Sequence, residues 1–437
     1  MLFQSTNSPG GAAVPFRDAV LGCLPDDGGL YVPEGAIDLR QFLLYMDEET
    51  AFPELVATLT PALFEGELDP FAASRVAQSA FDFAPELVRL DDDFSLLNLY
   101  NGPTGFFNDF GTAYLAAAIE EMARSSGEVI VLAAARSDSG SSMAHAFAGR
   151  KGIYAVLVYP PGPIRGIDSA ALFSNGGNIL PIRVDGTFDD CQRLISRAIL
   201  NRRFSGRYNV TSSNTINPGR LLPQVFYYIY AFIKAKRRLS GDVAFGVPCG
   251  NFGNLVAGLY AWKFGLPASG FVAAMNRNDN LGDFFRGRDF SPRPVVATNS
   301  PALDVGAPSN MSRLASFYRD APAVMRAMVY PASVNDGLTV ETMGNVRRKY
   351  RRHVDPHTAV AFAAAERIAE ERKWKGHTHT VVLATAHYAK DPGLVFGATG
   401  ESVEVPQKLL SLLNEVEPAV VISPNVDAFE GIIANCF

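Results

Sequence analysis

From Val129 onward the sequence alternates between short apolar runs and helical patterns, and this alternation restricts the folds that the chain can adopt. The apolar runs predict strands at Val129–Ala134, Tyr154–Tyr159, Ile179–Val184, Tyr208–Thr211, Val243–Val247, Val272–Met275 and Thr380–Ala384. The clearest helical stretches between them are Ser142–Gly149, Phe188–Leu200 and Leu221–Lys236. Short apolar strands joined by helices are typical of parallel sheets whose two faces are both covered. We therefore predict an α/β protein.

The first 95 residues lack this alternation. Helical patterns around Phe42–Met46 and Phe71–Phe81 predict a largely helical N-terminal subdomain. A chain of 437 residues is long enough for two or three lobes. We expect an N-terminal subdomain at 1–95, a large α/β domain at 96–125 and 212–400, a small α/β domain at 126–211, and a C-terminal segment at 401–437.

Charge and cysteine content exclude several classes of partner. The net charge of −6 gives no basic footprint for nucleic acid or an anionic membrane. The sequence has no apolar run of about 18 residues or more, and no signal-peptide pattern opens it. The four cysteines are far apart and form no metal or redox pair: Cys23, Cys191, Cys249 and Cys436. Free thiols of this kind indicate a reducing compartment, so we expect a cytoplasmic protein.

A glycine-rich turn at 248–254 connects the strand Val243–Val247 to a helical pattern at Leu255–Phe264. Glycine and asparagine tolerate positive φ and allow several backbone N–H groups to point at one spot. The N-terminus of the following helix adds a favourable dipole, so the turn suits an anion. Its spacing fits neither the P-loop nor the dinucleotide fingerprint, which favours a smaller phosphate. A tight turn without a ligand is the alternative interpretation.

Residues 247–254, with Ala257-Gly258-Leu259 and Gly265-Leu266-Pro267, resemble the cofactor-phosphate loop of the threonine synthase family. That family belongs to the tryptophan synthase β group of pyridoxal phosphate (PLP) enzymes. Further stretches resemble the family in the same order along the chain: Asp26–Pro33, Ser212–Asn217, Asn276–Asp279, Ala302–Asn310 and Asp355–Ala361. The resemblance covers essentially the whole chain. It implies fold type II, with two parallel-sheet α/β lobes around a central cleft and an N-terminal helical subdomain.

The resemblance also implies a cofactor, a reaction and a set of cofactor-binding residues. The family is PLP-dependent and converts O-phospho-L-homoserine into L-threonine and phosphate, which makes it a carbon–oxygen lyase. The cofactor-binding positions implied here are Gly250, Asn251, Phe252, Gly253, Asn254 and Thr385. Thr385 matches the threonine that faces the pyridine nitrogen. The expected partner is a small phosphorylated amino acid, and the expected assembly is a monomer or a homodimer.

The chain departs from the family at the position of the Schiff-base lysine. Gly102-Pro103-Thr104 and Asp109-Phe110-Gly111 match on either side, but the lysine is replaced by Asn108. A Schiff base needs a basic primary amine, and the same amine then moves the α-proton, so an asparagine amide can do neither. PLP, if retained, is expected to bind without a covalent bond. The alternatives are an enzyme with altered chemistry and a non-catalytic relative, a pseudoenzyme, that binds PLP or a phosphorylated amino acid.

A second departure lies in residues 136–141, between the strand Val129–Ala134 and the next helix. The family segment there is Ser-Gly-Asp-Thr-Gly and holds the amino-acid end of the substrate. Asp138, Gly140 and Ser141 match it, whereas Arg136, Ser137 and Ser139 differ. A helix N-terminus rich in hydroxyl groups suits a carboxylate. Arg136 either forms a forked contact with such an anion or lies at the surface.

The remaining substrate-binding positions implied by the resemblance are Thr104, Asn214, Asn217, His387 and Lys390. Asn214 and Asn217 have helix capping as their alternative role. Lys390 is expected near the mouth of the cleft and not as the Schiff-base donor, and Tyr388 and Asp391 beside it depart from the family pattern. We expect no metal: His353 and His357 have metal-like spacing, but Pro356 lies between them and no carboxylate cluster accompanies them.

Overall fold

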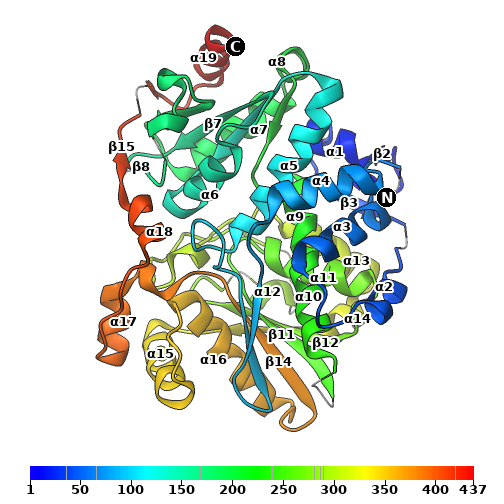
Figure 1. The fold of residues 1–437 in the computed structure, drawn as a ribbon, viewed down its shortest axis with the longest axis vertical. Coiled ribbons are helices and arrows are strands. Elements are labelled where there is room, and N and C mark those ends of the chain that lie inside the picture. The colour runs from blue at the N-terminus through cyan, green and yellow to red at the C-terminus, as the bar shows by residue number, and fades with distance from the viewer. Residues whose placement is uncertain are drawn as a thin grey trace.

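The computed structural model describes residues 1–35, 37–64, 66–162, 164–167, 169–237, 241–279, 281–285, 287–288, 290–418 and 420–437. For Ser137, Asp138, Ser169, Asp283 and Leu413 the description is limited to the backbone. Figure 1 shows two α/β lobes one above the other, with the N-terminal subdomain packed along one side of both. This arrangement confirms the predicted fold class, and the domain boundaries stay a prediction.

The larger lobe is built on a six-stranded sheet of order β13-β12-β11-β14-β5-β4. The strands are β13 Val329–Ser333, β12 Ala268–Met275, β11 Asp242–Pro248, β14 Thr378–Ala384, β5 Phe94–Asn98 and β4 Glu86–Arg89. All neighbours are parallel except β4 and β5. Val272 and Ala274 face one core, under α16 (Pro356–Glu371), while Phe271 and Ala273 face another, under α11 (Gly253–Lys263). Covered faces explain why these strands are continuously apolar.

The smaller lobe contains a five-stranded parallel sheet of order β10-β6-β7-β9-β16. The strands are β10 Val210–Ser212, β6 Val129–Ala134, β7 Ile153–Tyr159, β9 Ile179–Val184 and β16 Val420–Ile422. One face is covered by α7 (Phe188–Leu200) and α19 (Val426–Cys436), and the other by α6 (Ser137–Phe147). The outermost strand therefore comes from the C-terminal segment, which runs from the large lobe to the small one (Figure 1).

The N-terminal subdomain combines helices with a small antiparallel sheet. Its strands are β1 Leu2–Ser5, β2 Val14–Pro15 and β3 Tyr31–Glu34, and its helices are α1 Phe16–Gly22, α2 Arg40–Tyr45, α3 Phe52–Leu63 and α4 Pro70–Ala80. The other elements are β8 Ile164–Arg165, α8 Arg202–Tyr208, α9 Pro218–Leu221, α10 Val225–Ala235, α12 Gly282–Phe285, α13 Met311–Asp320, α14 Pro322–Met328, α15 Asp336–Tyr350, α17 Pro392–Thr399, α18 Gln407–Leu410 and β15 Glu415–Val416.

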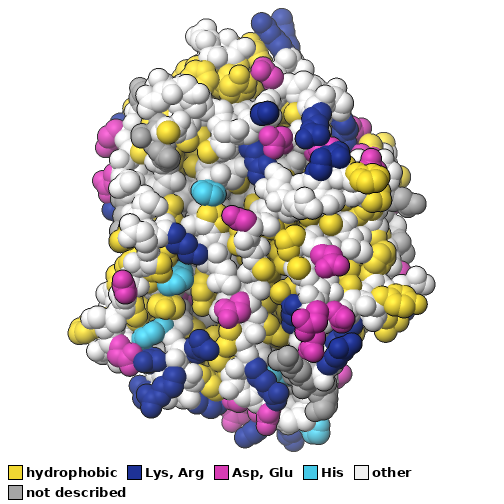
Figure 2. Space-filling view, in the orientation of Figure 1, with side chains coloured by type: hydrophobic (Ala, Val, Ile, Leu, Met, Phe, Trp, Pro, Cys, Tyr) yellow, Lys and Arg dark blue, Asp and Glu magenta, His cyan; other side chains and the backbone are white. Residues whose placement is uncertain are grey.

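Figure 2 shows the surface of the molecule in the orientation of Figure 1. Acidic and basic side chains are interspersed over this face, with a group of Lys and Arg side chains near α15.

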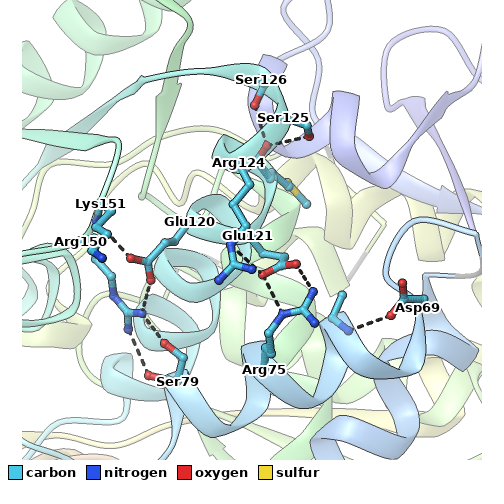
Figure 3. Close-up of polar contacts among 12 residues, drawn as sticks. Asp69, Arg75, Ser79, Glu120, Glu121, Arg124, Ser125, Ser126, Arg150 and Lys151 are labelled. Carbon is cyan, nitrogen blue, oxygen red and sulfur yellow. Dashed lines mark hydrogen bonds and ion pairs between the residues drawn. The ribbon is translucent and has the colours of Figure 1, made fainter.

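Helix α5 (Asn108–Ser126) lies at the junction of the three parts and contacts α4 and α6. Near its C-terminal end, Glu121 pairs with Arg75 of α4, while Glu120 accepts hydrogen bonds from Arg150 (2.8 Å) and from the backbone N–H of Lys151 (3.0 Å) (Figure 3). Two successive carboxylates thus connect α5 to the N-terminal subdomain and to the small lobe. Asn108 lies at the opposite end of α5, as the first residue of the helix.

Two helices begin earlier than the sequence pattern predicts. The sequence pattern predicts helices over residues 114–122 and 142–149. In the structure α5 begins at Asn108 and α6 at Ser137. Both first turns contain a glycine, which lowers helix propensity. Gly111 serves close packing, because a Cβ atom there would lie 2.6 Å from the backbone oxygen of Arg220. Asn108 is therefore the first residue of a buried helix and not a loop residue. Among the described residues, no helix is long and apolar enough to span a membrane.

Candidate functional site

The glycine-rich turn closes tightly between β11 and α11. Phe252 has a φ of +57° and precedes the first residue of α11, Gly253. A Cβ atom on Gly250 would lie 2.8 Å from the backbone oxygen of Ala302, and one on Gly253 would lie 3.3 Å from Nδ2 of Asn310. The first N–H groups of a helix have no intrahelical partner. The turn at 250–254, hereafter the cradle, therefore offers free N–H groups where side chains cannot intrude, as an anion site requires.

Two further loops hold the cradle in shape. The side-chain amide of Asn310 donates to Oγ1 of Thr215 (3.0 Å) and to the backbone oxygen of Asn251 (3.2 Å). Oδ1 of Asn251 accepts a hydrogen bond from Oγ of Ser309 (2.9 Å). Thr215, Ser309 and Asn310 lie in stretches that resemble the family, yet sequence reasoning assigned them no role. The signal was present in the matched motifs, but nothing in the sequence showed that the two loops meet at the cradle.

Arg313 holds these loops together. No role was assigned to it from the sequence. The side chain is 1% exposed and donates to the backbone oxygens of Tyr31 (2.9 Å) and Ile216 (2.6 Å) and to Oδ1 of Asn310 (2.7 Å). Its burial lowers its pKa to about 10. A buried guanidinium satisfied by carbonyl oxygens fixes loops that have no regular structure of their own. An arginine within a helix carries no sequence signal of that role.

Asn254 differs from the other cradle residues. Its Oδ1 accepts hydrogen bonds from the hydroxyl groups of Tyr227 and Tyr228, both at 2.7 Å, and its side chain is buried. Both tyrosines belong to α10. The Oδ1 atom of Asn254 therefore connects α11 to α10, whereas its Nδ2 atom has no hydrogen-bond partner among the described residues.

The turn that leads into Asn108 is held by a buried carboxylate. Asp109 accepts hydrogen bonds from the backbone N–H (2.9 Å) and the hydroxyl group (2.7 Å) of Thr104. A Cβ atom on Gly102 would lie 2.5 Å from Oδ2 of Asp109, so only glycine fits there. Burial raises the pKa of Asp109, and hydrogen bonds from Thr104 oppose the shift. The hydroxyl of Thr104 is thus engaged within the turn, and residue 108 is held at a fixed position.

Residues 385–390 lie alongside this turn. The backbone N–H of Phe107 donates to the backbone oxygen of Thr385 (2.8 Å), and that of His387 donates to Gly105 (2.9 Å). Nζ of Lys390 donates to the backbone oxygen of Thr104 (3.1 Å). The structure therefore brings Thr104, Asn108, Thr385, His387 and Lys390 into one region, at the junction of α5 and the end of β14.

His387 is uncharged in this environment. Burial lowers its pKa to about 4, and the positive charges of Lys408 and Lys390 add to the shift. Its Nδ1 accepts a hydrogen bond from the backbone N–H of Ala389 (3.1 Å), and its ring stacks on Tyr388 with centroids 4.4 Å apart. A neutral imidazole offers Nε2 for hydrogen bonding but adds no positive charge.

The segment 136–141 lies at the start of α6. The guanidinium of Arg136 lies 4.3 Å above the ring of Phe188 on α7, and Arg136 is exposed. Within the segment, the backbone N–H of Arg136 donates to Oγ of Ser139 (3.0 Å), and Oγ of Ser141 donates to the backbone oxygen of Arg165 (3.1 Å). Arg136 is thus a surface residue. The side chains of Ser137 and Asp138 lie outside the described part.

Gly140 packs against a buried hydroxyl group. A Cβ atom on Gly140 would lie 2.5 Å from the Oη atom of Tyr159, and burial raises the pKa of this phenol above its ordinary value. Among the described residues, Tyr159 Oη has no hydrogen-bond partner. A polar atom at the N-terminus of α6 is therefore left for a ligand or for water.

Asn214 and Asn217 have structural contacts. The amide of Asn214 bonds both the N–H and the oxygen of Ala134, each at 2.9 Å, and so extends the pairing of β6. Asn217 caps α9 through the N–H of Gly219 (2.8 Å) and donates to the backbone oxygen of Val20 (2.9 Å). Asn214 thus holds the end of β6 next to Thr215, whose hydroxyl group accepts hydrogen bonds from Asn310 (3.0 Å) and Asn251 (3.4 Å). Residues 213–220 therefore connect the end of β6 through Asn214, the cradle through Thr215, and the first turn of α5 through Arg220.

The two histidines with metal-like spacing have separate contacts. His353 pairs with Glu401 (3.3 Å), whereas Nε2 of His357 accepts the N–H of Ala302 (3.1 Å) and its Nδ1 bonds Asp355. Within the described part of the chain, no three His, Cys, Asp or Glu side chains are grouped as a metal site would require.

The molecule has two α/β lobes and a phosphate-type cradle between a parallel strand and a helix. A second predicted region, residues 385–390, follows the neighbouring strand β14. This arrangement is typical of a class of cofactor-dependent enzymes. Residues 87–386 match the family described as "Pyridoxal-phosphate dependent enzyme", and residues 358–433 match "Threonine synthase, C-terminal". The chain belongs to the threonine synthase family, whose cofactor is PLP.

Individual relatives support this assignment over the full length. The threonine synthase of Serratia marcescens is 33% identical over 416 residues, covering 93% of this chain and 94% of that protein. The crystal structure of threonine synthase from Escherichia coli superposes with a TM-score of 0.87 at 29% identity, covering 100% of both chains. A PLP-bound threonine synthase from Brucella melitensis has a TM-score of 0.86 at 27% identity, covering 100% of this chain and 99% of that one.

The residues present fit one end of PLP and not the other. The cradle, whose glycines pack against Ala302 and Asn310, presents the N–H groups at the start of α11 to a phosphate. At the other end, Asn108 provides no amine for a covalent bond. Two amines contact this turn: that of Lys390 donates to the backbone oxygen of Thr104 (3.1 Å), and that of Lys408 donates to the backbone oxygens of Asn101 (3.1 Å) and Gly102 (3.2 Å). The site is therefore fit for non-covalent binding of a phosphorylated ligand and unfit for attachment of an aldehyde at residue 108.

Proposed function

We propose that this chain is a threonine synthase-like protein that binds PLP, or a phosphorylated amino acid, without a covalent bond, and that it does not catalyse threonine formation by the lysine-dependent route. The observation that carries the proposal is Asn108 at the first position of α5, in a turn whose packing is otherwise complete. The support is chemical, because an amide cannot exchange a proton at neutral pH as an amine does.

Each part of the cleft has a defined role in this proposal. PLP, when bound in enzymes of this class, serves as an electron sink for the amino acid attached to it. Here the cradle amides would hold the phosphate, and the hydroxyl of Thr385 would face the ring nitrogen, as the family resemblance implies. Asn108 offers an amide donor and acceptor to the ligand, and the first turn of α6 offers its N–H groups to a carboxylate.

The test measures attachment and turnover together. Purified protein is titrated with PLP, reduced with borohydride and digested for mass spectrometry, and phosphate release from O-phospho-L-homoserine is measured in parallel. We expect saturable PLP absorption that dialysis removes, no adduct at residue 108 and no phosphate release. Phosphate release within about tenfold of an Asn108→Lys variant would contradict the proposal, since loss of acid–base catalysis alone is worth roughly 100- to 10,000-fold.

The second candidate is an enzyme in which another group has taken over the work of the lysine. The observation that favours it is the contact of Lys390 with Thr104, which places an ammonium group beside the turn that carries Asn108. Phosphate release by the native protein that disappears in a Lys390→Met variant, with PLP affinity retained, would establish this candidate.

The proposal extends to partner, assembly and compartment. A phosphorylated amino acid is supported by the cradle at one end of the cleft and the start of α6 at the other. We propose a monomer or a homodimer. A reducing, cytoplasmic compartment is supported by the absence of any disulfide among the four cysteines, of which Cys23, Cys191 and Cys249 are buried.

A further inference from the structure

A cavity of about 470 Å³ lies between α15 and α16, outside the cleft. It is lined by Asn345, Val346, Arg348, Lys349, Tyr350, Phe362 and Glu366. Its size falls within the range of small-molecule sites. Glu366 is nine residues beyond His357 on α16, so at 1.5 Å per residue it lies about 14 Å further along the helix axis than the residue that contacts the 302–303 loop. The cavity is therefore a separate place in the fold.

Aromatic and aliphatic side chains form the floor of the cavity. The rings of Tyr350 and Phe362 meet edge to face with centroids 5.9 Å apart, and Phe362 is 1% exposed. The hydroxyl of Tyr350 is fixed by a 2.6 Å bond to Asp91. Val346 is one turn before Tyr350 on the same face of α15. A rigid apolar floor of this kind suits the hydrocarbon part of a small ligand.

The walls carry opposite charges that do not neutralise one another at close range. Arg348 on α15 bonds the side-chain oxygen of Asn345, and Lys349 pairs with Asp91 at 3.1 Å. Glu366 lies on α16, one turn after Phe362, and is exposed at the edge of the cavity. Partial desolvation there raises the pKa of its carboxyl group, and the charge of Lys349 opposes the shift. Within the described part of the chain, neither Arg348 nor Glu366 forms an ion pair within salt-bridge distance.

We propose that this cavity binds a free amino acid with an apolar side chain, its carboxylate directed to Arg348, its ammonium group to Glu366, and its side chain packed on Tyr350 and Phe362. A guanidinium and a carboxylate on facing helices complement a zwitterion, and the aromatic floor selects the apolar side chain. A ligand that carries only a negative charge would be repelled by Glu366, and a ligand that carries only a positive charge would be repelled by Arg348. This inference is independent of the function proposed for the cleft.

The test is isothermal titration of the full-length protein with a panel of apolar amino acids. We expect at least one to bind with a Kd of about 1 mM or tighter. Its N-acetyl and carboxamide derivatives, which each lack one charge, are expected to bind about tenfold more weakly or worse, because each loses a charge-assisted hydrogen bond. Equal binding of the derivatives, or no binding by any amino acid, would overturn the proposal.

Variants locate the binding. Glu366→Gln and Arg348→Met are each expected to weaken it about tenfold or more, by the same reasoning. The matched control is Glu370→Gln, one turn further along α16 and outside the cavity, which should leave the affinity unchanged. All titrations are repeated with saturating PLP. Binding that survives both cavity variants but disappears with PLP would assign the amino acid to the cleft and refute the cavity site. Thermal unfolding of each variant excludes misfolding as the cause.

Discussion

The cradle and the turn around Asn108 illustrate two ways of building a functional site. The cradle relies on backbone N–H groups, and it is held by glycines and by loops that meet it through Thr215 and Asn310. The turn around Asn108 is equally well packed, with Asp109 fixing Thr104, but its family chemistry depends on a single side chain. A site made of backbone geometry resists substitution, whereas one replaced side chain removes an amine and leaves the surrounding structure in place.

The sharpest test of this comparison is Asn108→Lys. Because the turn around residue 108 is intact, the new amine should find PLP, and we expect a borohydride-stable adduct at residue 108 that the native protein lacks. Any turnover gained should exceed the native rate by at least roughly 100-fold. The matched control is Asn108→Met, which has a chain of similar length without an amine. An Asn108→Lys protein that binds PLP without forming the adduct would show that the cleft has changed beyond this residue.

The cradle is tested by Gly253→Leu. A Cβ atom added at this position would lie 3.3 Å from Asn310, so a larger side chain would displace the loops that shape the cradle. We expect affinity for PLP and for inorganic phosphate to fall at least about tenfold in calorimetry, a loss of about 1.4 kcal/mol. Gly431→Leu in α19, where no atom lies within 4 Å of the Cβ position, is the control. Unchanged phosphate affinity in the Gly253 variant would defeat the assignment.

Asn254→Ala separates backbone from side-chain contributions within the cradle. The side chain accepts two tyrosine hydroxyl groups in the protein interior, so its removal should lower the free energy of unfolding by about 1–3 kcal/mol. Phosphate affinity should fall less than in the Gly253 variant, because the backbone remains. Urea unfolding and calorimetry on the same sample check both parts. A tenfold loss of affinity without loss of stability would show that the side chain itself contacts the ligand.

Sequence periodicity predicted the sheets well because their strands are covered on both faces. The strands at 129–134 and 179–184 are observed at the predicted bounds, and 243–247 is extended by one residue at each end. The strand predicted at 208–211 begins only at Val210, because Tyr208 ends α8, and the strand predicted at 272–275 begins four residues earlier, at Ala268. The edge strands β13 and β16 were not predicted. The first turns of α5 and α6 escaped prediction because their glycines and hydroxyl residues serve packing and binding, and so lower local helix propensity. Such conflicts between propensity and fold are expected at functional sites.

For the site, the sequence predicted the segments involved but not the contacts of their side chains. The resemblance named the segments around 108, 136–141, 250–254 and 385–390. The structure shows that residues 213–220 connect α5, the end of β6 and the cradle, and that residues 385–390 contact the turn before Asn108. The resemblance could not show the contacts that single side chains make, such as those of Asn217 with Val20 and of Arg136 with Phe188. The two partners, Val20 and Phe188, are distant in sequence.

A pH-dependent effect of intermediate size is expected from His387. Its pKa is about 4 in the folded protein against an ordinary value near 6.5, so between these values the unfolded chain binds more protons. The free energy of unfolding should therefore fall as the pH drops from about 6.5 towards 4. The same direction holds for His379, whose pKa is also lowered. In a His387→Gln variant the slope should be shallower. Urea unfolding at pH 7 and pH 5 measures it, and an identical slope would contradict the assignment.

The smallest effect is expected at Arg136, although the family comparison places it at the substrate end. Its guanidinium lies over Phe188 at the surface, and an exposed contact of this type is worth about 0.5–1 kcal/mol. Arg136→Met keeps much of the apolar contact with the ring. We therefore expect unfolding free energy to change by less than about 1 kcal/mol, and affinity for a carboxylate ligand to stay unchanged in calorimetry. Ser139→Ala is the comparison, because its hydroxyl closes the first turn of α6 beside the proposed carboxylate site. If Arg136→Met instead weakens carboxylate binding more than Ser139→Ala does, the guanidinium leaves Phe188 when ligand binds, and the substrate end has been rebuilt around a new charged group.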